Sequence, residues 1–215
     1  MRILAALVVG SLVVGSNPVL ADCKAEVDAA FSKLREGKGF RLETKIVNEQ
    51  QGSLTMSVDY VLPDSMHQSV SLGDSPMKME MIAIGGKAWS NQGQGWAEVP
   101  ANFAEVITKQ LKETVAAPTK STASYDCLGE QEFEGKTYVV YRSSLTLQPD
   151  EKAKSEAATP DTKPAAGVQT VYVDKTSGLP VRNIVTKADA ADKRLFDGTF
   201  SVPTDIDIKP PANVK

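Results

Sequence analysis

The chain has 215 residues, of which 41% are hydrophobic and 24% are charged, and its formal net charge is -3 at pH 7. This length suits one domain with a sizeable core. The 24 Lys and Arg residues form no cluster, so nucleic acid and anionic membrane surfaces are poor candidates as partners.

The first 21 residues have the pattern of a secretory signal peptide. Met1-Arg2 is a short positive start, Ile3 to Val14 is an unbroken apolar run, and Val19-Leu20-Ala21 has residue types that suit a signal peptidase. The apolar run is too short to remain as a membrane-spanning helix. Asp22 precedes Cys23, where a lipidation site needs a small residue. We therefore expect an exported, unlipidated mature chain without stable membrane insertion, periplasmic or, in a host with one membrane, secreted.

Cys23 and Cys127 are the two cysteines of the chain. In the oxidising compartment that the export signal implies, a disulfide between them is favoured. Two unpaired thiols, or a bond between two chains, are the alternatives. A thioredoxin-type redox role has no support, because the sequence contains no CxxC pair.

The N-terminal part of the mature chain predicts a helix followed by a meander. From Asp22 to Glu36 apolar residues recur at helical spacing, and Gly37 and Gly39 end the pattern. The period then changes to two, which predicts antiparallel strands with one apolar and one polar face. These strands are expected over residues 40–46, 54–62, 65–72 and 77–83, followed by hairpin strands over 87–90 and 96–99.

The remaining elements are one more helix and a second group of strands. Asn102 begins a helical pattern that runs to about Val115. Strands are expected over residues 125–130, 136–147, 168–174, 179–187 and 194–202. Segment 149–166 has no aromatic residue and is rich in Pro, Ala and charged residues, so we expect a flexible loop there.

These elements predict a single α+β domain over residues 22–215, after the signal peptide 1–21. Its main feature would be a strongly curved antiparallel sheet of about ten strands, an incomplete barrel with two helices on the concave face. Two short helices cannot fill so wide a concavity, which leaves a hollow for an apolar ligand. The candidate lining residues are those predicted to face inward: Leu42, Met56, Val58, Met66, Val70, Met79 and Met81 from strands, and Phe103, Ile107 and Leu111 from the second helix.

The order of elements, together with three short motifs, resembles the LolA/LolB superfamily, which includes the mycobacterial LppX/LprG lipid-binding proteins. The motifs are Gly39-Phe40-Arg41-Leu42-Glu43, Ile84-Gly85-Gly86-Lys87-Ala88-Trp89, and the hairpin Val171 to Pro180 with its Asp-x-x-Ser-Gly-Leu-Pro turn. The resemblance implies an incomplete barrel whose helices form a lid over an apolar hollow that holds acyl chains. It also implies a lipid or an acylated protein as ligand. An early-strand arginine is important in the carriers of that family, and Arg41 is the nearest candidate.

The methionines raise one alternative function. Met77, Met79 and Met81 alternate along one strand, and thioethers suit Cu(I), so periplasmic copper binding is a minor hypothesis. The favoured interpretation is an apolar lining that adapts to variable contents. His67 falls on the polar face of its own strand, opposite the methionines.

The sequence carries no assembled catalytic constellation. His67 is the only histidine, and no G-x-S-x-G, GxGxxG or P-loop motif occurs, so we expect neither enzymatic activity nor a cofactor. The favoured function is non-catalytic binding of a lipid, an acylated protein or another apolar ligand. The alternative is an envelope sensor or protein-interaction module with a filled core, which would contact its partner through polar edge strands or loop 149–166.

Overall fold

The computed structural model describes residues 22–48, 52–73, 75, 77–116, 122–147 and 165–215. The predicted signal peptide 1–21 and most of the expected loop 149–166 lie outside the described residues. Residues 165 and 166 at the end of that expected loop belong to a strand. Among the described residues, no helix has the length and apolar character needed to cross a membrane.

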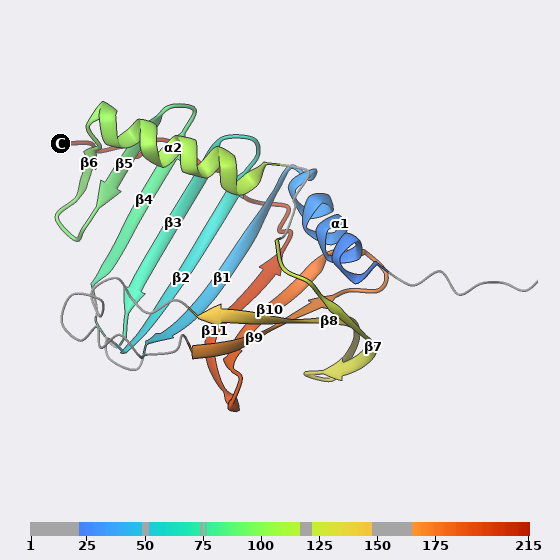
Figure 1. The fold of residues 1–215 in the computed structure, drawn as a ribbon. Helices are drawn as coiled ribbons and strands as arrows, with labels where there is room; N and C mark the ends of the chain where they lie inside the picture. Colours follow the sequence, from blue (N-terminus) through green and yellow to red (C-terminus); the bar gives the residue numbers. More distant parts are fainter. Residues whose placement is uncertain (1–21, 49–51, 74, 76, 117–121, 148–164) are drawn as a thin grey trace, which may run out of the picture.

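Two helices and one sheet make up the described part of the chain (Figure 1). The helices are α1 (Cys23–Arg35) and α2 (Ala101–Val115). The strands, in chain order, are β1 (Gly39–Asn48), β2 (Gly52–Val61), β3 (Ser65–Leu72), β4 (Lys78–Ile84), β5 (Lys87–Asn91), β6 (Trp96–Glu98), β7 (Asp126–Phe133), β8 (Lys136–Leu147), β9 (Ala165–Val173), β10 (Pro180–Lys187) and β11 (Ala190–Ser201). The prediction of an α+β fold is confirmed.

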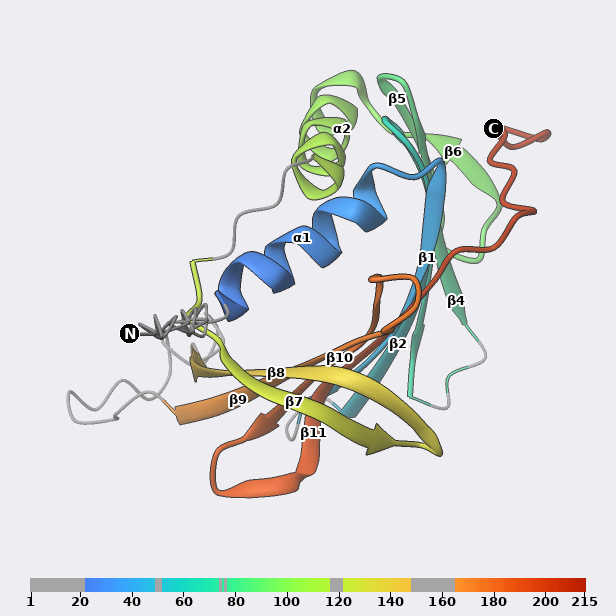
Figure 2. The same ribbon diagram turned by 90° about the vertical axis from the view of Figure 1, so that its right-hand side faces the viewer.

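The strands form one antiparallel sheet that does not close. Its order is β6-β5-β4-β3-β2-β1-β11-β10-β9-β8-β7, so β6 and β7 are the edges. Two meanders, β1 to β6 and β7 to β11, are joined where β1 pairs with β11, with Leu42 opposite Phe200 and Ile46 opposite Phe196. The sheet bends strongly, and both helices lie on its concave side (Figure 2). We call this concave side the inner face and the opposite side the outer face.

The two helices cover different parts of the inner face. α1 begins at the cap residue Asp22, whose side chain accepts a hydrogen bond from the Ala25 N–H at 3.1 Å. It packs Val27 and Ala30 against Tyr141, Val171 and Val173 of the second meander. The predicted disulfide between Cys23 and Cys127 is confirmed, with a Cα–Cα distance of 5.4 Å. It ties the start of α1 to the edge strand β7.

The buried face of α2 differs from the one expected from sequence. The side chains of Ala104, Thr108, Leu111 and Val115 are buried, whereas Phe103 is 60% exposed. The physical reason is close packing: the small side chains of α2 lie in one cluster with Ala83 and Ala88, both fully buried on β4 and β5. Small residues on both elements let the helix approach the sheet, and the bulky Phe103 ring faces outward.

Candidate functional site

The inner face of β1 to β5 is mainly apolar, but α2 crosses it near one end only (Figure 1). At that end the inward side chains are buried under the helix: Phe40, Tyr60, Met66, Ala83 and Ala88. Towards the other end of the same strands, Ile46 is 37% exposed and Leu72 is 51% exposed. The helices therefore leave part of this apolar surface uncovered. This agrees with the expectation that two short helices are too small to cover the concave face of so wide a sheet.

Two cavities lie on this incompletely covered surface. One, of about 250 Å³, lies between α2 and the strands β2 to β4. The other, of about 200 Å³, lies further along β3 to β5. Gln68 and Met81 line both, so the two cavities adjoin. We call the pair the inner hollow. Each alone is smaller than the roughly 300–1,000 Å³ typical of ligand sites, and together they reach that range.

The structure places the candidate residues from the sequence in three positions. Those that line the inner hollow are Met66, Val70, Met79, Met81, Ile107 and Leu111. Val58 is 2% exposed inside the core, and Leu42 and Met56 pack against that core partly buried. Phe103 lies outside the hollow on the exposed side of α2.

The inner hollow also has polar lining residues that were not selected from the sequence. Five of them are uncharged: Gln68, Ser90, Gln92, Gln110 and Thr114. The charged one is Glu80, which lines the cavity along β3 to β5. The Gln68 side-chain amide donates a hydrogen bond to the Met56 sulfur at 3.1 Å. Strand alternation alone could have identified Gln68 as a lining residue, because it occupies an inward position between Met66 and Val70.

The sheet separates the methionines from the histidine. Met79 and Met81 line the inner hollow, and Met77 is exposed just before β4. His67 lies on the outer face, with its Nε2 atom 3.4 Å from a carboxylate oxygen of Glu80. Among the described residues, no group of three or more His, Cys, Asp or Glu side chains could hold a metal ion. The folded sheet thus does not bring the His67 imidazole next to the methionine thioethers that the copper-binding hypothesis invokes.

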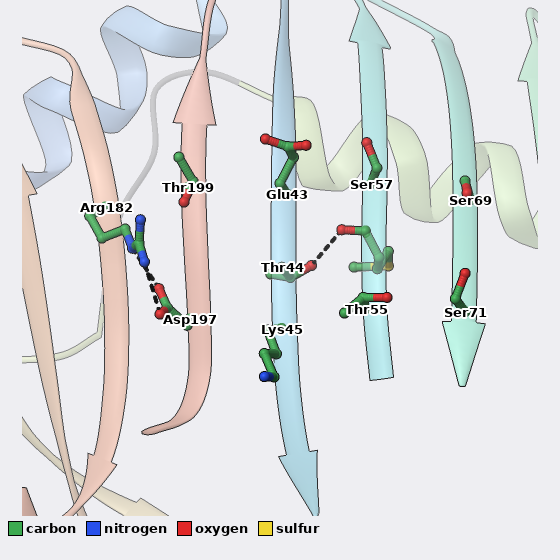
Figure 3. Close-up of a pocket in the computed structure, with 11 residues that line it drawn as sticks. Glu43, Thr44, Lys45, Thr55, Ser57, Ser69, Ser71, Arg182, Asp197 and Thr199 are labelled. Carbon is green, nitrogen blue, oxygen red and sulfur yellow. Dashed lines mark hydrogen bonds and ion pairs between the residues drawn. The ribbon is translucent and has the colours of Figure 1, made fainter. Parts of the chain in front are cut away.

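The outer face has a different, polar depression of about 470 Å³ in the middle of the sheet (Figure 3). Its lining is dominated by hydroxyl and charged side chains: Glu43, Thr44, Lys45, Thr55, Ser57, Ser69, Ser71, Arg182, Asp197 and Thr199, together with Met56. Arg182 donates two hydrogen bonds to Asp197, at 2.6 and 2.9 Å.

Arg41 also belongs to the outer face. Its guanidinium donates to both carboxylate oxygens of Asp59, at 2.5 and 2.8 Å, across the β1–β2 pair. These hydrogen bonds raise the pKa of Arg41. Arg41 alternates along β1 with Phe40 and Leu42, which pack on the inner face, so its side chain points away from the inner hollow. The structure does not bring Arg41 together with the apolar candidate residues.

The Arg182–Asp197 pair predicts an acid-sensitive contribution to stability. Burial raises the pKa of Asp197, but hydrogen bonds from Arg182 and Arg194 outweigh burial, and the pKa is lowered below its ordinary 3.8. A carboxyl with a lowered folded-state pKa stabilises the fold above the unfolded pKa, and this stabilisation is lost as the pH falls through the folded pKa. Asp197→Asn should therefore cost about 1–3 kcal/mol at pH 7 and progressively less below pH about 4.

Urea denaturation of both proteins across this pH range measures the difference. Asp192→Asn is the matched control, because this aspartate is exposed on the same strand and its replacement should change the free energy of unfolding little. A gap between wild type and Asp197→Asn that stayed constant from pH 7 to pH 2 would contradict the ion-pair account.

Two solved structures share this architecture over most of both chains. LprF from Mycobacterium bovis gives a TM-score of 0.55 at 12% sequence identity and covers 89% of this chain and 97% of its own. The lipoprotein LppX from Mycobacterium tuberculosis gives 0.53 at 12% identity, with 86% and 98% covered. No protein-family model and no curated protein matches the chain. The chain thus has the fold of LprF and LppX, which confirms the resemblance at the level of the fold alone.

Proposed function

We propose that this protein is an exported, non-catalytic carrier that binds a lipid, or the acyl group of an acylated protein, in the inner hollow. The observation that carries the proposal is the apolar surface that continues beyond α2, where Val70 and Met79 line a cavity instead of packing under the helix. Met81 connects this cavity to the one under α2. The fold shared with LprF and LppX supports it, since the family that the sequence resembles holds acyl chains under such a sheet.

The chemistry of the lining suits an acyl chain. Each methylene that leaves water for an apolar surface contributes about 0.8 kcal/mol, so even a short buried segment would give measurable affinity. Methionine side chains are flexible and polarisable, which suits chains of differing length and shape. Among the described residues that line the cavity under α2, none carries a charge.

Native mass spectrometry of the protein isolated from its own envelope tests the proposal. We expect a mass higher than that of the mature chain by the mass of a co-purified lipid, and lipid extraction would identify that ligand. Delipidated protein should then take up a fluorescent fatty acid. A clean mass for the unliganded chain, combined with no uptake, would count against the carrier function. Detection of the chain in a periplasmic fraction, lacking residues 1–21, would test the export step.

A second candidate function is a protein-interaction module of the envelope. It is favoured by the outward side of α2, where Phe103 is 60% exposed and Val106 is 63% exposed. Replacing both with serine should leave fatty-acid uptake intact if the protein is only a carrier of free lipid. If crosslinking to an envelope protein is lost in this variant, or on deletion of residues 150–165, the interaction function is supported.

A further inference from the structure

The outer face of the second meander carries a hollow unlike the rest of that face. It has a volume of about 350 Å³ and is lined by residues of β7 to β11. The Phe133 and Tyr172 rings stack there, with centroids 4.3 Å apart, and Ile184 is only 5% exposed. The neighbouring polar depression around Ser57 and Ser69 contains no aromatic lining residue. The outer surface therefore changes from hydroxyl-rich to aromatic and apolar at this point.

The charged side chains that line this hollow are all basic. They are Arg142, Lys187 and Arg194, and among the described lining residues none is acidic. This stands out in a chain whose formal net charge is -3. We call the site the outer basic hollow.

Acidic residues do lie nearby, but around the outer basic hollow and not in its lining. Asp197 accepts a hydrogen bond from Arg194 at 2.7 Å as well as those from Arg182, and Glu134 lies 3.7 Å from Arg182. Asp126 stands opposite Arg142 in the β7–β8 pair. A guanidinium has five N–H donors, so the hydrogen bond from Arg194 to Asp197 leaves it donors for a ligand.

The guanidinium groups and the aromatic rings are in direct contact. Arg182 and Arg194 each lie 5.7 Å from the centre of the Phe133 ring, within the range of a cation–π interaction. Burial raises the pKa of Tyr172, whereas Arg194 and Arg142 act to lower it, which reflects the closeness of both guanidinium groups to the phenol. Anion-binding groups and an apolar platform thus occupy one site.

We infer that the outer basic hollow binds an anionic amphiphile. A phosphate or carboxylate head would accept hydrogen bonds from Arg142, Lys187 and Arg194, and the adjoining apolar segment would lie on Phe133 and Tyr172. Strand alternation makes this site independent of the inner hollow. On β8, Tyr141 packs under α1 on the inner face, and the next residue, Arg142, faces the outer basic hollow. The inference therefore does not rest on the proposed carrier function.

Titration of the oxidised mature chain with hexyl phosphate, followed by backbone amide NMR, tests the inference. We expect saturable shifts at Thr170 and Thr186, which line the outer basic hollow, that weaken as salt is added. The double variant Arg142→Gln, Lys187→Gln should bind at least about tenfold more weakly. The control Lys45→Gln, Lys175→Gln removes the same charge at two positions that do not line the hollow and should bind like wild type.

Two further ligands separate the parts of the site. Inorganic phosphate and hexanol should each bind at least about tenfold more weakly than hexyl phosphate, because each offers only one of the two matching groups. Vesicles of phosphatidic acid, compared with phosphatidylcholine, identify the source of the head group. Binding to phosphatidic acid vesicles would mean that the ligand is a lipid in a membrane, and binding of hexyl phosphate without vesicle binding would mean that it is a free amphiphile. Both results support an anionic amphiphile as the ligand.

Several results would overturn the inference: no saturable shift, equal binding of hexanol, equal binding of inorganic phosphate, or undiminished binding by the Arg142→Gln, Lys187→Gln variant. Thermal unfolding of each variant verifies that it is folded. If the double variant does not fold, Thr186→Glu places a carboxylate in the outer basic hollow without removing any arginine. This variant should also lose hexyl phosphate binding, and retained binding would overturn the inference equally.

Discussion

Replacing Cys23 and Cys127 together with serine is expected to lower the free energy of unfolding by about 4–5 kcal/mol. The bond closes a loop with a sequence separation of 104 residues, so its loss gives the unfolded chain much more conformational freedom. It also holds the start of α1 against β7, an edge strand paired on one side only, by β8. Urea denaturation measures the loss, and thermal unfolding should show a midpoint about 10–20 °C lower.

The native protein under reducing conditions is the matched control for the serine substitutions, because it breaks the same bond without changing either residue. Both samples should unfold at the same urea concentration. A loss below about 1 kcal/mol would contradict this account. It would mean that packing of Val27, Ala30 and Phe31 against the second meander holds α1 without the bond.

Met81→Glu is expected to reduce the affinity for a fluorescent fatty acid by about 100-fold or more. Met81 lines both cavities of the inner hollow, so the new carboxylate would stand in the middle of the proposed acyl path. An ionised group that loses water against an acyl chain without a partner costs several kcal/mol, and each 1.4 kcal/mol is a factor of ten in affinity. Val70→Glu should act in the same direction. Equilibrium titration of delipidated protein measures both.

Ser71→Glu is the control for these two variants. Ser71 follows Val70 on β3 but faces the outer depression, so the same new charge is placed on the other side of the sheet. Its fatty-acid affinity should equal that of the wild type, and all three variants should keep the wild-type circular dichroism spectrum. If Met81→Glu bound fatty acid as well as Ser71→Glu does, the inner hollow would not be the binding site.

Local patterns in the sequence were sufficient to predict the helices and strands and the face of the sheet on which each strand residue lies. Side chains alternate with a period of two along a strand, so Met66, Val70 and Met81 were predicted to share one face, and the pairing of β3 with β4 confirms it. The same rule placed Arg41 away from that face. The predicted export signal and the presence of two cysteines were enough to predict the disulfide without knowledge of the fold. The ligand role of the inward residues stays a prediction.

The rotation of α2 could not be predicted in this way. Phe103, Ile107 and Leu111 have helical spacing, but so do Ala104, Thr108, Leu111 and Val115, and the second set is buried. The choice depends on how closely the helix can approach Ala83 and Ala88, which are brought beneath it only by the folded sheet.

The strands, their two faces, the two helices and the disulfide could be predicted from the sequence, because they depend on neighbours along the chain or on simple cysteine chemistry. The folded chain was needed to show which part of the inner face stays uncovered and that Phe133, Arg142 and Arg194 line the outer basic hollow together. The first depends on where α2 crosses the bent sheet, and the second on the side-by-side arrangement of β7 to β11 in that sheet. Contacts between residues far apart in sequence leave no local periodic pattern from which they could be predicted.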